Sequence, residues 1–192
     1  MDMSPAFIAG VAENFPKAQI TFDRFHIVKL LNEAMDNVRK AERKEHEYLK
    51  GHKYTFLKNK DNLSEKQRDA LDELITLYPK LGQAYRLKTL FNDLWTMPTK
   101  EAAHQFMIEW CAEVRVAKIP AFEPFIKMLI GHWSGVIHFI ESRLTNGLLE
   151  GINHKVQLAK RRARGYRNMS NLINMVHFLC GKLKFSYPLY ST

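Results

Sequence analysis

Residues 25–38 read FHIVKLLNEAMDNV, and this stretch decides the fold class of the chain. Apolar side chains return here every three or four positions, which is the spacing of one face of an amphipathic helix. The stretch predicts a helix that starts near Phe25 and becomes charged from Arg39 to Lys50. Its apolar stripe consists of Ile27, Leu30, Leu31, Ala34, Met35 and Val38.

The chain after residue 60 shows the same helical periodicity. Ser64, followed three residues later by Gln67, is a capping-box signature that opens a further helix. More helices are expected at about 81–94, 99–116, 122–142, 148–162 and 170–183. The fold class is therefore mostly α. Three tryptophans within these apolar patterns are predicted to lie in the core: Trp95, Trp110 and Trp133.

A small β element is expected before the long helices. Residues 1–3 resemble the end of an apolar strand, Ser4 and Pro5 can open a helix, and Pro16 stops it. The short β-prone run 19–22 then ends at Asp23. The order of strand end, helix and strand is part of a βαβ unit, although no parallel partner strand is visible downstream.

Length and composition describe an ordinary globular protein. The 192 residues are 46% hydrophobic and 26% charged, enough for one domain or two small ones. Two cysteines, 69 positions apart, exclude a disulfide scaffold and fit a reducing compartment. Without a charge-free window of about 18 residues or a signal-peptide pattern, no membrane partner is expected, and the cytoplasm is the expected location.

The positive charge is concentrated at one end of the sequence. Of the formal net charge of +9, residues 143–192 carry +8, and Glu150 is their only acid. Such an end attracts polyanions, either nucleic acid or an anionic membrane surface, whereas the alternative is a solvated helix end. Tyr166 in this run can stack or pack. The residues expected to contact phosphates are Lys155, Lys160, Arg161, Arg162, Arg164 and Arg167.

Three carboxylates are candidates for chemistry. Asp2 and Asp23 each end an expected strand, so they share a sheet edge if the strands are parallel neighbours, or else they are helix-cap or turn residues. Glu150 either favours the positive end of its helix or holds a divalent metal beside a phosphate. Asn146 and Asn153 lie on the same polar stripe as Glu150.

The Asp23–His26 pair is weak evidence for a metal site, because Asp-x-x-His has many structural occurrences. A histidine that is hydrogen-bonded to the aspartate or to the backbone is the simpler interpretation. Phosphate-binding glycine loops and the serine-hydrolase motif are absent from the sequence, so those activities have no support.

Several segments, read together, resemble bacterial insertion-sequence transposases of the DDE class, in the ISL3 family. They are DMSPAF at 2–7, FDRFHIVKLLN at 22–32, TNGLLEGIN at 145–153 and KRRARGYRN at 160–168. The resemblance spans essentially the whole chain and implies the C-terminal part of a ribonuclease-H-like α/β catalytic domain. It divides the chain into a partial core at 1–35, an all-helical insertion at 36–140, and the glutamate helix with basic helices at 141–192.

In that family three carboxylates hold two Mg²⁺ or Mn²⁺ ions. The resemblance makes Asp2 the second acid and Glu150 the third, both as catalytic metal ligands. It gives Asp23 and His26 a supporting role near the site, beside Asn146 and Asn153.

The intact enzyme would hydrolyse one DNA strand and join the freed 3′ hydroxyl to target DNA. The resemblance also implies double-stranded DNA, both transposon ends and target, as the partner, and a homo-oligomer as the intact enzyme. The family's first acid and its N-terminal DNA-binding segments have no counterpart in this sequence. The chain is therefore expected to be a C-terminal part that is inactive alone. The alternatives are a non-catalytic DNA-binding remnant and a helical protein–protein interaction module.

Overall fold

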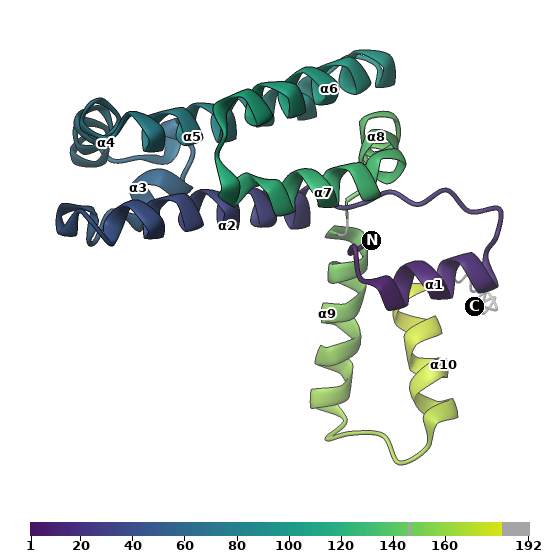
Figure 1. The fold of residues 1–192 in the computed structure, drawn as a ribbon. Helices are drawn as coiled ribbons and strands as arrows, with labels where there is room; N and C mark the ends of the chain where they lie inside the picture. The colour runs from purple at the N-terminus through teal and green to yellow at the C-terminus, as the bar shows by residue number, and fades with distance from the viewer. Residues whose placement is uncertain (146, 182–192) are drawn as a thin grey trace, which may run out of the picture. The chain divides into compact units, whose positions relative to one another are not determined.

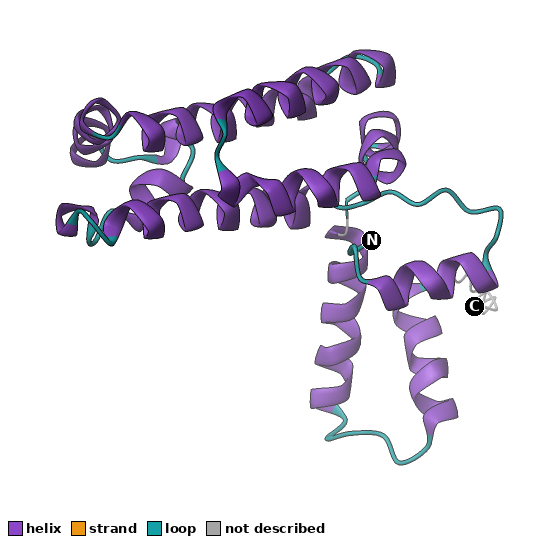
Figure 2. Cartoon of the chain, viewed as in Figure 1, coloured by secondary structure: helices purple, strands orange, loops and turns teal. Residues whose placement is uncertain are grey.

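The computed structural model describes residues 1–145 and 147–181 (Figure 1). The chain divides into two compact units, one from Met1 to Leu144 and one that begins at Thr145. The described part contains ten α-helices joined by loops and short 3₁₀ turns (Figure 2). The first unit contains α1 (Pro5–Asn14), α2 (Arg24–Arg43), α3 (Lys53–Leu57), α4 (Glu65–Leu77), α5 (Pro79–Leu90), α6 (Lys100–Ala117), α7 (Glu123–Gly131) and α8 (Trp133–Ser142). The second contains α9 (Gly147–Arg162) and α10 (Met169–Cys180).

The mostly α prediction is confirmed, and the apolar stripe of the opening stretch forms the buried face of α2. Ile27, Leu31 and Met35 are almost fully buried, and α2 packs against α3, α5 and α7. One residue of the charged part is buried. Arg39 lies in the core, where it is bound to Asp36 one turn earlier.

Aromatic side chains fill the centre of the first unit. Trp110 is 1% exposed, and its Nε1 donates to the carbonyl oxygen of Leu87 at 2.9 Å. Its ring meets those of Phe91 and Phe125 edge-on, with centroid distances of 4.8 and 5.7 Å. Trp95 is also buried, so two of the three predicted core tryptophans are confirmed. Trp133 is only partly buried.

The capping box predicted at the start of α4 is present. The Gln67 amide donates to Ser64 Oγ at 3.3 Å, and the Ser64 amide donates to Gln67 Oε1 at 3.2 Å. Ser4 occupies the N-cap position of α1, but its side chain makes no capping hydrogen bond. Local sequence therefore places these helix starts well, even where a cap remains unused.

The single helix expected at 122–142 is two helices. They are separated at His132, whose φ and ψ of −121° and 19° are not helical. The preceding Gly131 has low helix propensity, which lowers the cost of the break. After the break, the His132 ring packs edge-on against Phe22 at a centroid distance of 4.9 Å, and Gly135 contacts the same ring. Tertiary packing against the 19–23 segment thus overrides the periodicity.

The expected small β element is wrong as regular structure, because the described residues contain no strand (Figure 2). One residue nevertheless shows the hydrogen bonding of a parallel pair. The Met1 nitrogen donates to the Thr21 carbonyl at 2.6 Å, and the Asp23 amide donates to the Met1 carbonyl at 3.1 Å. The Phe22 amide donates a hydrogen bond to the Gly135 carbonyl at 3.1 Å. Helix α8 therefore accepts a backbone hydrogen bond from the 19–23 segment that a neighbouring strand would accept in a sheet.

The contact between Gly135 and Phe22 gives a stability prediction. A Cβ at Gly135 would lie 2.4 Å from the Phe22 ring, which is buried. We expect Gly135→Ala to lower the free energy of unfolding by about 1–3 kcal/mol, as overpacking does in well-packed cores. The matched control is Gly131→Ala, because a Cβ there meets nothing within 4 Å. Chemical denaturation measures both variants, and equal stabilities would contradict the close approach.

The second unit is a hairpin of α9 and α10, and no side chain described in it is buried. Its start at residue 145 is close to the predicted boundary at 141. Helix α2, by contrast, crosses the predicted boundary at 35 without interruption. The division into core, insertion and glutamate helix remains a prediction.

Candidate catalytic carboxylates and nucleic-acid interface

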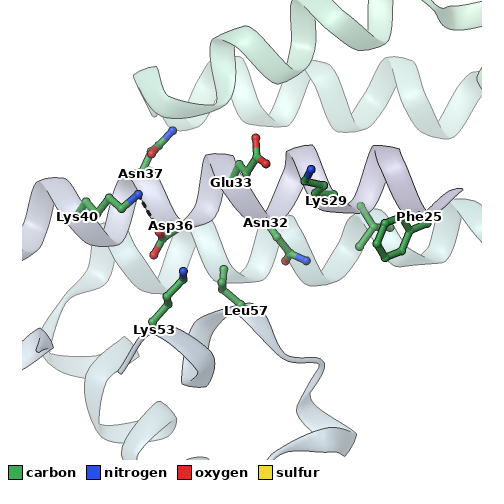
Figure 3. A pocket seen from close by; sticks show the side chains of 10 residues that line it. Phe25, Lys29, Asn32, Glu33, Asp36, Asn37, Lys40, Lys53 and Leu57 are labelled. Carbon is green, nitrogen blue, oxygen red and sulfur yellow. Dashed lines mark ion pairs between the residues drawn. The ribbon is translucent and has the colours of Figure 1, made fainter. Parts of the chain in front are cut away.

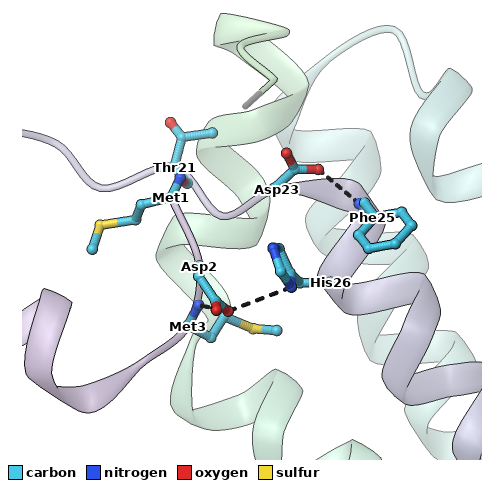
Figure 4. A network of polar contacts seen from close by, with 7 residues as sticks. All are labelled: Met1, Asp2, Met3, Thr21, Asp23, Phe25 and His26. Carbon is cyan, nitrogen blue, oxygen red and sulfur yellow. Dashed lines mark hydrogen bonds and ion pairs between the residues drawn. The ribbon is translucent and has the colours of Figure 1, made fainter. Parts of the chain in front are cut away.

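Asp2 lies beside the start of α2 (Figure 4). Its Oδ1 accepts a hydrogen bond from the Met3 amide at 2.7 Å and lies 3.5 Å from Nδ1 of His26. The Asp2 side chain is 46% exposed, so a ligand can reach it. The structure therefore brings together two of the predicted site residues, Asp2 and His26, from segments that are 24 positions apart.

Asp23 has a structural role in the same place. Its Oδ1 accepts from the Phe25 amide at 2.8 Å, which makes it the N-cap of α2, and it is 8% exposed. This is the helix-cap alternative anticipated from the sequence. Because Met1 pairs between Thr21 and Asp23, the backbone also holds Asp2 next to this cap. The supporting role of Asp23 and His26 at a metal site remains a prediction.

The donor chemistry around Asp2 suits an open metal site. Mg²⁺ is usually held by one or two carboxylates together with waters and phosphate oxygens of the substrate. Within residues 1–145 and 147–181 no three His, Cys, Asp or Glu side chains gather in a metal-binding group. A half-exposed aspartate therefore fits a shared site that substrate oxygens complete, and it does not fit a closed protein cage.

Glu150 lies in the first turn of α9 and is exposed. Asn153 follows it by three positions and is exposed as well. Asn146 lies outside the described residues. Asp2 belongs to the first unit and Glu150 to the second.

The basic run lies at the end of α9 and in the connection to α10. Arg164, with a φ of 54°, and Gly165, with a φ of 98°, are both left-handed. The Gly165 amide donates to the Lys160 carbonyl at 2.9 Å and the Arg164 amide to the Arg161 carbonyl at 3.1 Å, which together form a Schellman cap. The helix end expected at about residue 162 is confirmed. An arginine here occupies the left-handed position that glycine adopts at least cost.

All six predicted phosphate-contacting residues lie in this unit. Five are exposed, and Lys160 is half-buried. No acid occurs in the sequence between residues 151 and 181. Tyr166 is half-buried and lines a pocket together with residues of α9 and α10. The arrangement presents cations without competing carboxylates, and that suits sequence-independent contact with a phosphate backbone.

The burial of three charged side chains in the core, Lys88, Asp36 and Arg39, was not predicted. Lys88 is 2% exposed, and its Nζ donates to the carbonyls of Phe56, Leu57 and Lys58 at 2.8, 2.8 and 3.0 Å, at the end of α3. Burial lowers the pKa of Lys88 to about 8. Its position one residue after Leu87, on a helix with an apolar face, gives no sequence signal for an ammonium that caps a distant helix.

Asp36 and Arg39 are buried together on α2. Arg39 Nε donates to Oδ1 of Asp36 at 2.8 Å, and Lys40 Nζ lies 3.0 Å from Oδ2 of the same carboxylate (Figure 3). Burial acts to raise the pKa of Asp36, but the bonds from Lys40 and Arg39 outweigh it and hold that pKa below its usual value. The spacings of three and four residues were visible in the sequence, but they occur equally on solvated helices.

The family model for ISL3-type DDE transposases, described as "Transposase", matches residues 1–176. The transposase for insertion sequence element IS1001 of Bordetella parapertussis is 30% identical over 176 residues, which cover 88% of this chain. The transposase for insertion sequence element IS1557 of Mycobacterium tuberculosis is 26% identical over 191 residues, which cover 85%. The chain spans 43% of the length of each of these relatives.

No solved structure matches the chain. None of the described helices is both long and apolar enough to cross a membrane. The matched region includes Asp2, Glu150 and the whole basic run. A family match over more than nine-tenths of the chain decides its membership: the protein belongs to the ISL3 family of DDE transposases.

Proposed function

We propose that this chain is the C-terminal part of a transposase that cuts DNA at the ends of an insertion sequence and joins them to a target. One observation carries the proposal, namely the family match across residues 1–176. It includes both candidate acids and the acid-free basic run. DNA is the polyanion that this class of protein must hold, so the charge distribution and the family point to the same partner.

We assign Asp2 and Glu150 the role of Mg²⁺ or Mn²⁺ ligands. When bound, the metal would activate the attacking oxygen and stabilise the leaving oxygen at the phosphate. The half-exposed Asp2 carboxylate, with His26 3.5 Å away, supplies negative charge at a position that a DNA phosphate can reach. His26 orients Asp2, and Asp23 fixes the start of the helix that carries His26.

The fold assignment is part of the proposal. We assign α1, the 19–23 segment and α9 to a ribonuclease-H-like core, and the helices between them to an insertion. The parallel hydrogen bonding of Met1 with Thr21 and Asp23 supports this, because it has the pattern of a βαβ unit.

A cleavage assay tests the assignment of the two acids. The 192-residue chain is expected to leave end-labelled transposon-end DNA intact in Mn²⁺, because its two assigned acids are one short of the family's three. In a full-length transposase with this sequence as its C-terminal part, Asp2→Asn and Glu150→Gln are each expected to reduce nicking by about 10³-fold, the loss of several kcal/mol of metal assistance.

The control for this assay is Glu141→Gln, an exposed carboxylate paired with Lys100 at 3.2 Å. It should nick at the parent rate. Nicking by the 192-residue chain alone, abolished by Glu150→Gln, would mean that another acid such as Asp23 completes the site. Nicking that survives both acid variants would refute their assignment.

A further inference from the structure

Three residues of α8 contact the extended 19–23 segment. They are Gly135, His138 and Ser142. Their spacings of three and four residues place them on one face of the helix. The Gly135 carbonyl accepts from the Phe22 amide at 3.1 Å, and the hydroxyl oxygens of Ser142 and Thr21 lie 3.4 Å apart. This face of α8 therefore binds the segment by hydrogen bonds, as a neighbouring strand would.

His138 makes the contact between these two. Its Nδ1 lies 3.1 Å from the carbonyl oxygen of Ile20, and its side chain is half-buried. Because a carbonyl oxygen accepts and cannot donate, this contact assigns the ring proton to Nδ1. The two residues are 118 positions apart in the sequence. The hydrogen bond therefore ties α8 to a distant segment and contributes nothing to the helix itself.

The segment that His138 binds also holds Asp2 in place (Figure 4). The carbonyl of Thr21, one residue after the carbonyl bound by His138, accepts from the Met1 nitrogen at 2.6 Å. The Asp23 amide donates to the Met1 carbonyl at 3.1 Å. Asp2 follows Met1 directly, so the backbone of this segment determines where the Asp2 carboxylate lies.

We propose that His138 is a positioning residue for Asp2, an inference that rests on the proposed function. Its ring fixes the carbonyl of Ile20, and the backbone hydrogen bonds that follow fix Met1 and with it the carboxylate assigned above to the metal. Groups that orient a metal ligand contribute about 10–100-fold to metal affinity or activity. Because His138 acts through the backbone and does not touch the carboxylate, its contribution is at the lower end of this range.

Amide hydrogen exchange of the purified 192-residue chain tests this path without metal or DNA. His138→Leu removes the donor, so the Asp23 amide, which binds the Met1 carbonyl, should exchange about tenfold faster, as the loss of one hydrogen bond predicts. His138→Asn is the matched variant, because its side-chain NH2 group can take the place of Nδ1, and it should exchange at the parent rate. Amides in the core of α2 and α6 should be unaffected by either change.

Metal dependence tests the consequence for the site. In a full-length transposase with this sequence as its C-terminal part, His138→Leu should raise the Mn²⁺ concentration for half-maximal nicking by about tenfold. The affinity for transposon-end DNA and its salt slope should stay at the parent values, because the path does not include the basic run. His138→Asn should restore the parent metal dependence. His46→Leu, at an exposed histidine beyond the end of α2, is the control and should change none of these.

The outcomes distinguish the two proposals. Parent exchange at Asp23 or parent metal dependence in His138→Leu would overturn the positioning role and leave the assignment of Asp2 intact. Faster exchange throughout α2 and α6 would also overturn it, because His138 would then stabilise the whole unit. The same holds if His138→Asn fails to restore the parent values, since the donor at Nδ1 would not be the cause. Nicking by Asp2→Asn at the parent rate would overturn the proposed role of Asp2 and the inference together.

Discussion

Replacing Arg161, Arg162 and Arg164 together by alanine is expected to weaken binding to any duplex by about 10²–10³-fold near 0.1 M salt. Each phosphate contact contributes a slope of about −0.9 to a plot of log affinity against log salt concentration, so the slope should flatten by about 2–3 units. The three guanidiniums lie at the end of α9 and in its Schellman cap. Filter binding across a salt series measures both quantities.

Two controls separate contact from charge and from unfolding. Alanine at Lys44, Lys50 and Lys66, exposed lysines of the other unit, removes the same charge and should leave the slope almost unchanged. Arg164→Gly should reduce the slope by about 1 unit while stabilising the cap by about 1 kcal/mol, because glycine relieves the left-handed backbone at residue 164. If the triple variant keeps the salt slope of the parent, the basic run does not contact DNA and is a solvated helix end.

Lys88→Met is expected to lower the free energy of unfolding by about 2 kcal/mol at pH 7. It leaves three carbonyls at the end of α3 without their donor, and hydrogen bonds from a charged group are worth about 1.5–3 kcal/mol each, offset by the cost of burying the ammonium. Exposed lysines such as Lys66 should tolerate methionine within about 0.5 kcal/mol. Urea denaturation gives the comparison.

The pH dependence of the same variant has a definite sign. The pKa of Lys88 is about 8 in the folded chain and 10.5 when unperturbed. Between these values the unfolded chain holds more protons than the folded chain, so the stability of the parent rises with pH. The free energy of unfolding of the parent should therefore exceed that of Lys88→Met by a margin that grows by up to about 3 kcal/mol from pH 8 to 10.5. A gap that narrows over this range would show that the buried amine stays protonated.

Local signals in the sequence predicted much of the helical fold. The capping box at Ser64 and the end of the helix at residue 162 depend on neighbours within a few residues, so the local sequence was sufficient to predict both. The break at His132 depends on Phe22, more than 100 positions away, and periodicity carries no information about that contact. The burial of Lys88 has the same origin, because its three carbonyl partners lie 30 to 32 positions away. Arg39 instead pairs with Asp36 on its own helix, and that spacing occurs equally on solvated helices.

The candidate site was partly predictable for a related reason. Asp2 and Asp23 were each expected to end a short strand, with a sheet edge or a helix cap as the alternatives. The hydrogen bonds of Met1 to Thr21 and Asp23 bring the two segments together, and Asp23 is the N-cap of α2. Regular strands were the wrong form for that neighbourhood, because α8 supplies a hydrogen-bond partner through Gly135.

The hairpin of α9 and α10 is expected to unfold locally, unlike the core of the first unit. Few hydrophobic contacts stabilise a segment without buried side chains. The free energy of opening this segment is therefore far below the free energy of global unfolding. Amide hydrogens of α9 should therefore exchange by local fluctuation, while those of α2 and α6 exchange only with the whole core. The carboxylate of Glu150 and the arginines that follow it thus lie on the less cooperative of the two units, where binding of a ligand can itself stabilise the helices.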